Sequence, residues 1–250
     1  MKKSLSFVIG AFCFCLPLSV AHAEEKKEAP LDPTAAQIRV QVEFIDLSHE
    51  QLTELMFGTK PAANDVELRK QLAQLVKDGK AKVMETLLCT GRSGQKSTSE
   101  SIEEFIYPTE YEPASFADEG KKQEPGKTEA VDSGKREALG PTPTAFETRN
   151  LGSTVEIEPT VSDDGKTIDL RLIPEIVYHV ENEIWAEWKD EHGSAHVQMP
   201  VMYTLRLNTV VKLANGKPLL VGALTPKNDK GAPDRDRKLM VFVKADVLPE

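Results

Sequence analysis

The sequence is poor in cysteine and contains none of the common catalytic motifs. Cys13 and Cys15 lie in an N-terminal apolar run, and Cys89 is the one cysteine beyond it. If that run is removed, no intramolecular disulfide can form, and the fold must be held by its hydrophobic core. The chain has no G-x-S-x-G, no phosphate-binding glycine-rich motif, no H-E-x-x-H and no C-x-x-C. These absences favour a non-catalytic protein without a cofactor.

Basic charge is also scarce. Lysine and arginine number 31 against 40 acidic residues, which gives a formal net charge of -9. Loss of Lys2 and Lys3 with the N-terminal run would lower the charge to -11. An acidic chain is a poor match for nucleic acid or for an anionic membrane surface. After Val20 no apolar run is long enough to cross a bilayer as a helix.

Residues 1–23 have the three parts of a secretory signal peptide. Two lysines are followed by an apolar run from Leu5 to Val20 and by an A-x-A cleavage site that ends at Ala23. A retained membrane anchor is the alternative, but the run is shorter than the roughly 18 to 20 residues that a spanning helix needs. We therefore predict export to the periplasm or outer membrane, cleavage before Glu24 and a flexible segment over 24–36.

The predicted fold begins with a strand and two helices. Apolar and polar residues alternate over 37–44, which predicts a strand with one buried face. Ser48 and Gln51 have the spacing of a capping box, which predicts a short helix that ends at Gly58. A second helix, capped by Asn64, is predicted to pack on the sheet. Its apolar stripe consists of Leu68, Leu72, Leu75 and Val76.

The remaining ordered parts are predicted to be strands joined by turns. The strands cover 83–89, 97–107, 155–161, 168–172, 201–207, 219–224 and 239–247. We expect the first two to pair across the turn 91–94, and the next two to form the clearest hairpin. The strand at 219–224 is expected to be more buried than its neighbours.

A polar loop is predicted to interrupt these strands over about 112–140. Lysine, glutamate, glycine, proline and serine dominate it, so it cannot bury enough apolar surface to offset its ordering entropy. We interpret it as an insertion in one domain over 37–250. The predicted fold class is α+β with β dominant, built from mainly antiparallel sheets with two short helices near the start of the mature chain.

One group of residues could hold a metal ion. His192 and His196 lie near Glu183, Asp190 and Glu191. Histidines four apart bind zinc well when a helix presents both on one face, but the Gly-Ser between them disfavours a helix. A solvated loop is therefore the favoured interpretation, and we assign no metal, catalytic or cofactor-binding residue.

Cysteine and tryptophan offer two further candidates. Cys89 lies in an apolar strand without a nearby histidine or lysine partner, which favours a buried, inert thiol over a reactive one. Trp185 and Trp188, with Ile184 and Tyr178, could form an aromatic contact patch. Packing in the core or across strands is the favoured alternative for two tryptophans in a strand.

Four segments occur in an order that is typical of one protein family. The weaker two are Val40–Leu47 and Arg92–Lys96. The stronger two are 152–175, with a G-S-T-V-E-I-E-P-T-V strand, a D-G turn and a P-E ending, and 209–224, with T-V-V, N-G-K and L-V-G-A-L. Together they resemble the conserved domain of bacterial secretins, the outer-membrane ring proteins of type II and type III secretion systems and type IV pili. The match runs from about Ile38 to Val247.

The resemblance implies a non-catalytic structural or accessory component of a protein secretion or type IV pilus assembly. It also implies envelope protein partners or self-association. The family's V-P-x-L-G-x-I-P-x-x-G-x-L-F stretch is absent, and the polar residues 225–231 take its place. This departure concerns the pore and not the sheet.

One alternative is a soluble periplasmic or surface-exposed binding module that has lost pore formation. Another is a metal-dependent hydrolase built on His192 and His196. Membrane insertion and oligomeric state stay open.

Overall fold

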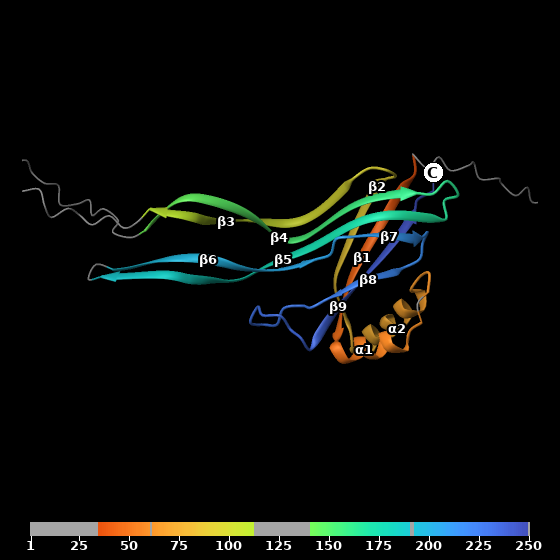
Figure 1. The fold of residues 1–250 in the computed structure, drawn as a ribbon, viewed down its shortest axis with the longest axis horizontal. Helices are drawn as coiled ribbons and strands as arrows, with labels where there is room; N and C mark the ends of the chain where they lie inside the picture. The colour runs from red at the N-terminus through yellow and green to blue at the C-terminus, as the bar shows by residue number, and fades with distance from the viewer. Residues whose placement is uncertain (1–34, 61, 113–140, 191–192, 250) are drawn as a thin grey trace, which may run out of the picture. The chain divides into compact units, whose positions relative to one another are not determined.

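A computed structural model describes residues 35–60, 62–112, 141–190 and 193–249. These residues form two antiparallel sheets and two helices (Figure 1), which confirms the predicted α+β class with β dominant. Several predictions lie outside the described residues. They concern the signal peptide over 1–23, most of the flexible segment after it, residues 113–140 of the polar loop, and Glu191 and His192.

The first sheet has the strand order β2-β1-β9-β8, and the second has the order β3-β4-β5-β6 with β7 paired to β5. In chain order the elements are β1 (Gln37–Ser48), α1 (His49–Gly58), α2 (Val66–Lys77), β2 (Lys82–Arg92), β3 (Ser97–Glu112), β4 (Thr142–Val161), β5 (Thr167–Asp190), β6 (Gly193–Arg206), β7 (Thr209–Ala214), β8 (Leu219–Leu224) and β9 (Arg237–Val247).

Strand β1 lies between two layers of the fold. Its predicted alternation is confirmed, because Val40, Val42 and Phe44 are buried against the second sheet. Ile45 and Leu47 point to the opposite face and belong to a separate core under the helices. Successive side chains of a strand alternate between faces, so one strand can contribute to both cores.

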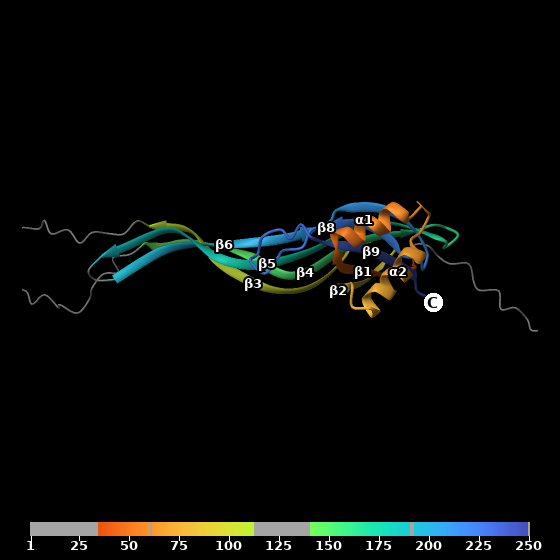
Figure 2. The ribbon, with the colours of Figure 1, turned by 90° about the horizontal axis from the view of Figure 1, so that it is seen from below.

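The two helices cover the far face of the first sheet and, seen from below, lie in front of β1 and β9 (Figure 2). The capping box of α1 is confirmed, since Gln51 N–H donates to Ser48 Oγ (3.1 Å) and Ser48 N–H donates to Gln51 Oε1 (3.2 Å). Within α2, Leu68 and Leu72 are buried in the core under the helices. In the described part of the chain, no helix is long and apolar enough to span a membrane.

The predicted cap of α2 is one residue too early. Asp65, and not Asn64, is the residue at the N-cap. The Asp65 carboxylate does not cap the helix, because it accepts a hydrogen bond from Leu220 N–H at 2.7 Å. This contact joins the start of α2 to strand β8. The Asn64 Oδ1 atom accepts a hydrogen bond from Val66 N–H at 3.4 Å, so both a local contact and a tertiary contact hold the start of the helix.

The hairpin of β4 and β5 supplies the other half of the main core. Val161 pairs with Ile168 across the predicted turn, which confirms this hairpin. Ile157, Leu170 and Leu172 are fully buried and pack in the same core as the inward side chains of β1 and β9. The two sheets therefore form a sandwich around one shared core.

The predicted pairing of 83–89 with 97–107 is wrong. Both strands exist, but β2 pairs with β1 in the first sheet and β3 pairs with β4 in the second. The turn between them is bonded to the residue before β1 and to β4: Ser93 N–H donates to Ala36 O (2.9 Å), and Gly94 N–H donates to Pro159 O (2.7 Å). The turn therefore carries the chain from one sheet to the other.

The prediction of a more buried strand at 219–224 is also wrong. Strand β8 lies at the edge of the first sheet, and none of its residues is fully buried. The central strand β9 is the buried one, with Leu239, Met240, Val241, Phe242 and Val243 all inside the protein. The apolar runs of β8 and β9 are similar, but β9 has a neighbouring strand on each side, whereas β8 has one only on the β9 side among the described strands.

Replacing Leu72 by alanine should lower the free energy of unfolding by about 2 to 4 kcal/mol, because the lost methyl groups leave a cavity between α2 and the sheet. Lys70→Ala on the exposed side of the same helix removes only a surface ion pair with Glu67 and should cost less than about 0.5 kcal/mol. Urea unfolding followed by circular dichroism measures both values. Equal losses would contradict the packing of α2 on the sheet.

Candidate interaction surface

The buried core stops about halfway along β4 and β5, the two longest of the described strands. Gly152 of β4 pairs with Val177 of β5, and this is the last pair between these strands. Beyond it β4 pairs with β3 alone and β5 pairs with β6 alone. We call residues 102–112 with 142–151 the first distal pair, and residues 178–190 with 193–203 the second distal pair.

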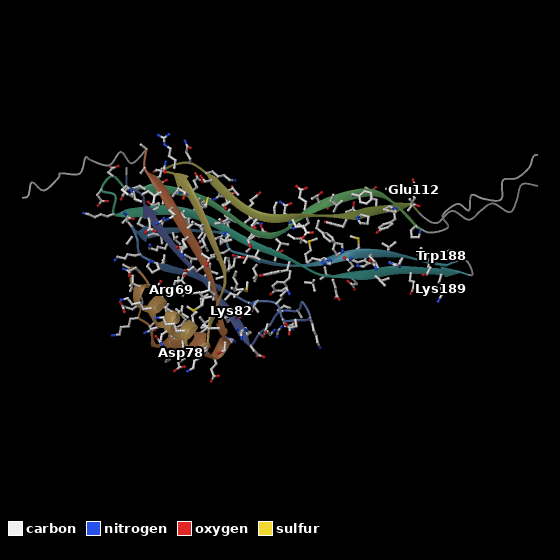
Figure 3. The ribbon with its side chains drawn as sticks, turned by 180° about the vertical axis from the view of Figure 1, so that it is seen from behind. Arg69, Asp78, Lys82, Glu112, Trp188 and Lys189 are labelled. Carbon is white, nitrogen blue, oxygen red and sulfur yellow. The ribbon has the colours of Figure 1, made fainter. Side chains whose placement is uncertain are left out.

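The distal pairs extend away from the core. Figure 3 shows Glu112 at the end of the first distal pair and Trp188 and Lys189 at the end of the second, far from Arg69 and Asp78 of the helical layer. Side chains of the first pair between 142 and 150 are nearly all exposed, whereas alternate side chains after 152 are buried. The sandwich thus carries two strand pairs that its core does not cover.

Gly152 lies at the point where the strands separate. Its φ is 114°, and a Cβ atom added there would lie 2.3 Å from the Ser101 carbonyl oxygen. A residue with a side chain would be strained by the backbone angle and would also clash with β3. Glycine therefore allows β4 to stay paired with β3 while it leaves β5.

One carboxylate joins three strands near this separation. Glu175 of β5 lies 3.3 Å from Arg149 of β4 and 3.9 Å from Arg206 of β6. The Glu175 side chain is 22% exposed, so these ion pairs are partly shielded from water. Such a network favours one relative position of the strands over others.

Residues 225–236 brace the base of the second distal pair. The Tyr203 hydroxyl donates to Thr225 O at 2.9 Å, and Lys227 Nζ lies 5.3 Å from the centre of the Tyr178 ring. Lys238 Nζ also donates to Thr225 Oγ1 at 2.8 Å. Burial raises the pKa of Tyr203 and of Tyr178 above the ordinary value for tyrosine, and the Glu85 carboxylate adds to the rise at Tyr178. These contacts hold Thr225 and Lys227 against the second distal pair.

The distal pairs expose large apolar side chains. Phe146 is 58% exposed and Trp185 is 71% exposed. The part of the prediction that placed Trp185 in the core is therefore wrong, whereas Trp188 is half-buried. The exposed apolar residues of the two pairs are Ile102, Ile106, Phe146, Ile184 and Trp185. Alternation alone could not reveal this exposure, because it shows which side chains share a face and not what covers that face.

The outer edges of the second sheet are bordered by no other strand that the structure describes. Among the described residues, β3 pairs only with β4 and β6 pairs only with β5. Strand β3 carries five glutamates and no basic residue, whereas β6 has no carboxylate and ends at Arg206. The two edges therefore differ in charge. The sequence prediction missed residues 108–112 at the end of β3, because the Tyr107-Pro108 step was expected to end the strand.

Two of the candidate metal ligands, Glu191 and His192, lie outside the described residues. His196 lies on β6 and Glu183 on β5, and the described residues include no group of three or more potential ligands that could hold a metal ion. Cys89 is 7% exposed, as predicted for an inert thiol, and burial raises the pKa of that thiol.

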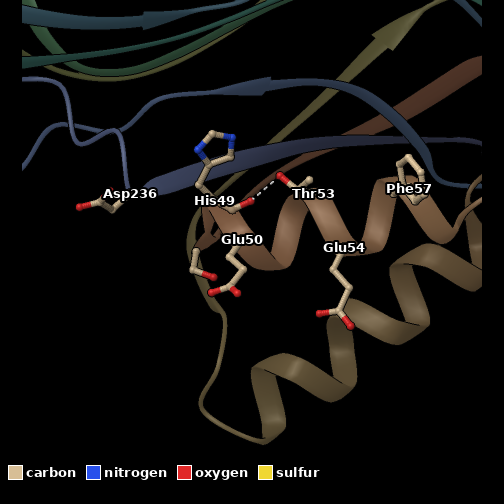
Figure 4. A pocket seen from close by; sticks show the side chains of 7 residues that line it. His49, Glu50, Thr53, Glu54, Phe57 and Asp236 are labelled. Atoms are coloured by element: carbon tan, nitrogen blue, oxygen red, sulfur yellow. Dashed lines mark hydrogen bonds between the residues drawn. The ribbon is translucent and has the colours of Figure 1, made fainter.

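A hollow of about 980 Å³ lies beside α1 (Figure 4). Its lining includes His49, Thr53, Phe57 and Asp236. The Thr53 hydroxyl donates to the His49 carbonyl oxygen at 2.9 Å, which is a bond along the helix and not to the imidazole. This arrangement offers no pair of nucleophile and base.

No protein-family model matches the chain, and neither does any curated protein. Solved structures similar to it include Aeromonas hydrophila ExeD, at 11% identity and a TM-score of 0.42, over 86% of this chain and 49% of that one. The type II secretin GspD from enteropathogenic Escherichia coli has 12% identity and a TM-score of 0.42, over 86% and 70% of the two chains.

A third similar structure is the type IV competence pilus secretin PilQ of V. cholerae, with 12% identity and a TM-score of 0.42, over 88% of this chain and 63% of that one. The chain thus spans about half the length of the Aeromonas protein and less than two thirds of PilQ. We draw no function from these likenesses, because the identities and TM-scores are low.

Replacing Gly152 by alanine should lower the free energy of unfolding by at least about 2 kcal/mol, because the strained φ and the contact with Ser101 O act together. Gly94→Ala is the matched control. Its φ of 72° is also left-handed, but a Cβ there meets no atom within 4 Å, so the expected cost is about 1 kcal/mol. Chemical unfolding compares the two, and equal costs would exclude a close approach of β4 and β3 at Gly152.

The Cys89 thiol should react slowly in the folded protein. Because its pKa is raised, less thiolate is present at pH 8 than in an ordinary cysteine, and burial blocks the reagent. In the chain from residue 24, labelling with a chromogenic disulfide reagent should be on the order of 100-fold slower in buffer than in urea. Equally fast labelling in both would contradict the buried position of Cys89.

Proposed function

We propose that this chain is a non-catalytic, secretin-like structural or accessory component of a cell-envelope assembly for protein secretion or type IV pili. We propose further that it acts by association of its distal pairs with other protein chains, including copies of itself. One observation carries this proposal: the two distal pairs lie outside the hydrophobic core. Among the described strands their outer edges are unpaired, and they expose large apolar side chains.

The physical reason lies in the stability of isolated strand pairs. A two-stranded ribbon is at best marginally stable in water, and a free edge presents unpaired N–H and C=O groups. Residues 142–151 of β4 and residues 178–190 of β5 lie beyond the last pair between these two strands, so each belongs to such a two-stranded ribbon. Association with another chain would pair the edges and cover side chains such as Phe146 and Trp185.

The charge difference between the edges favours one geometry of self-association. The acidic β3 edge of one copy would repel another β3 edge, whereas β6 carries no carboxylate. Pairing of β3 with β6 of the next copy is a heterologous contact. Contacts of this kind form a ring if the rotation closes and an open filament if it does not.

The alternative function is a soluble periplasmic or surface-exposed binding module that has lost pore formation. It is favoured by the acidic residues Glu181, Glu183 and Glu187, which are exposed in the second distal pair. Both functions need export, for which we propose residues 1–23 as the signal. They differ in whether copies of the chain associate with each other.

Replacing Phe146 by glutamate should weaken self-association of the chain from residue 24. Phe146 is 58% exposed, so the fold should tolerate the change, but burial of the charge in a contact would be costly. Light scattering over a concentration series should show a dissociation constant at least about tenfold higher than that of the unchanged protein.

Val210→Glu is the control for this experiment. Val210 is also an exposed apolar strand residue, at 71%, but it lies on β7 outside the distal pairs. It should leave the association unchanged. An unchanged protein that stays monomeric at every concentration, or equal effects of the two substitutions, would overturn the proposal and favour the monomeric binding module.

A further inference from the structure

An open groove lies between the two distal pairs. Its volume is about 330 Å³. Strand β3 contributes three aromatic side chains, and β6 closes the groove from the other pair. The residues that matter for its chemistry are Phe105, Tyr107, Tyr111, Pro143, His196 and Pro200. The groove is thus lined by aromatic rings and prolines from strands that are far apart in sequence.

The aromatic rings are held in place by contacts on both sides of the groove. Phe105 stacks on His179 of β5, with ring centres 4.8 Å apart and planes inclined at 24°. The Tyr107 hydroxyl donates to Glu147 at 3.2 Å, and the Tyr111 hydroxyl donates to Gln198 O at 3.5 Å. Rings fixed in this way present apolar faces without a further loss of side-chain entropy on binding.

Prolines restrict how a guest chain could bind in the groove. Pro143 and Pro200 lie within β4 and β6, where they pair with Tyr111 and Asn182. Proline has no N–H to donate, so a continuous ladder of hydrogen bonds to an added strand is interrupted here. A guest must therefore be recognised by side-chain packing. The polyproline II helix is such a guest, because it needs no ladder and docks its rings on aromatic side chains.

The strands that border the groove are acidic. Among the described residues of the distal pairs, the basic side chains are Arg149, which is paired with Glu175, and Lys189. The carboxylates are those of Glu103, Glu104, Glu110, Glu112, Glu147, Glu181, Glu183 and Glu187. The resulting negative potential favours a guest with positive charges next to its prolines.

We propose that this groove binds a proline-rich segment with flanking lysine or arginine residues, in polyproline II conformation, on a partner protein. The site lies between the distal pairs, so it does not depend on the edge pairing of the proposed function. It gives the chain a second mode of recognition, by ring stacking and charge.

A labelled synthetic peptide with a run of prolines between two arginines is the probe. Fluorescence anisotropy with the chain from residue 24 should show saturable binding. A peptide with the same prolines between two glutamates should bind several-fold more weakly, and so should a glycine-serine run between two arginines. No binding of the first peptide, or equal binding of the glycine-serine peptide, would overturn the proposal.

Substitutions locate the site. Tyr111→Ala should raise the dissociation constant of the arginine-flanked peptide about tenfold, in line with the loss of one aromatic contact. Val210→Ala shortens an exposed apolar side chain on β7, outside both distal pairs and outside the groove lining, and it should have no effect. Circular dichroism checks that both variants fold. Equal effects of the two would place the peptide elsewhere. If Tyr111→Ala abolishes self-association and the unchanged protein does not bind the peptide, the groove binds a second copy of the chain, and the proposal is overturned.

Discussion

The packing of the inward side chains of β1 and β9 against those of β4 and β5 is the contact on which the rest of the structure depends. Val42 and Val241 from the first sheet and Ile157 and Leu170 from the second are all fully buried in this core. Burial of such side chains is the main favourable term in folding. Because this core stops at Gly152, the outer halves of β4 and β5 each have one hydrogen-bonded neighbour among the described strands.

Local patterns in the sequence predicted most elements but few of their neighbours. The capping box at Ser48 and the hairpin around Gly165 were predictable because residues close in sequence determine them. The partner of β2 was not, because the turn after it is fixed by hydrogen bonds from Ser93 to the residue before β1 and from Gly94 to β4. The N-cap of α2 depends in the same way on a contact between Asp65 and β8.

The candidate surface was harder to predict for a related reason. Apolar residues continue to alternate with polar ones beyond the core, so Phe146 and Ile157 are similar in sequence context and differ only in what covers them. The polar stretch 225–231 was visible in the sequence. Its contacts were not, because those of Thr225 and Lys227 with Tyr203 and Tyr178 join segments distant in sequence.

The central claim is that a stable sandwich carries two weakly supported strand pairs that other chains complete. Amide hydrogen exchange on the chain from residue 24 tests it most directly. In dilute protein, β1, β9 and residues 152–161 should exchange slowly, and residues 142–151 and 193–203 much faster. The two faster segments should become protected as concentration rises. Equal protection of all these segments at low concentration, with no change on association, would contradict the account.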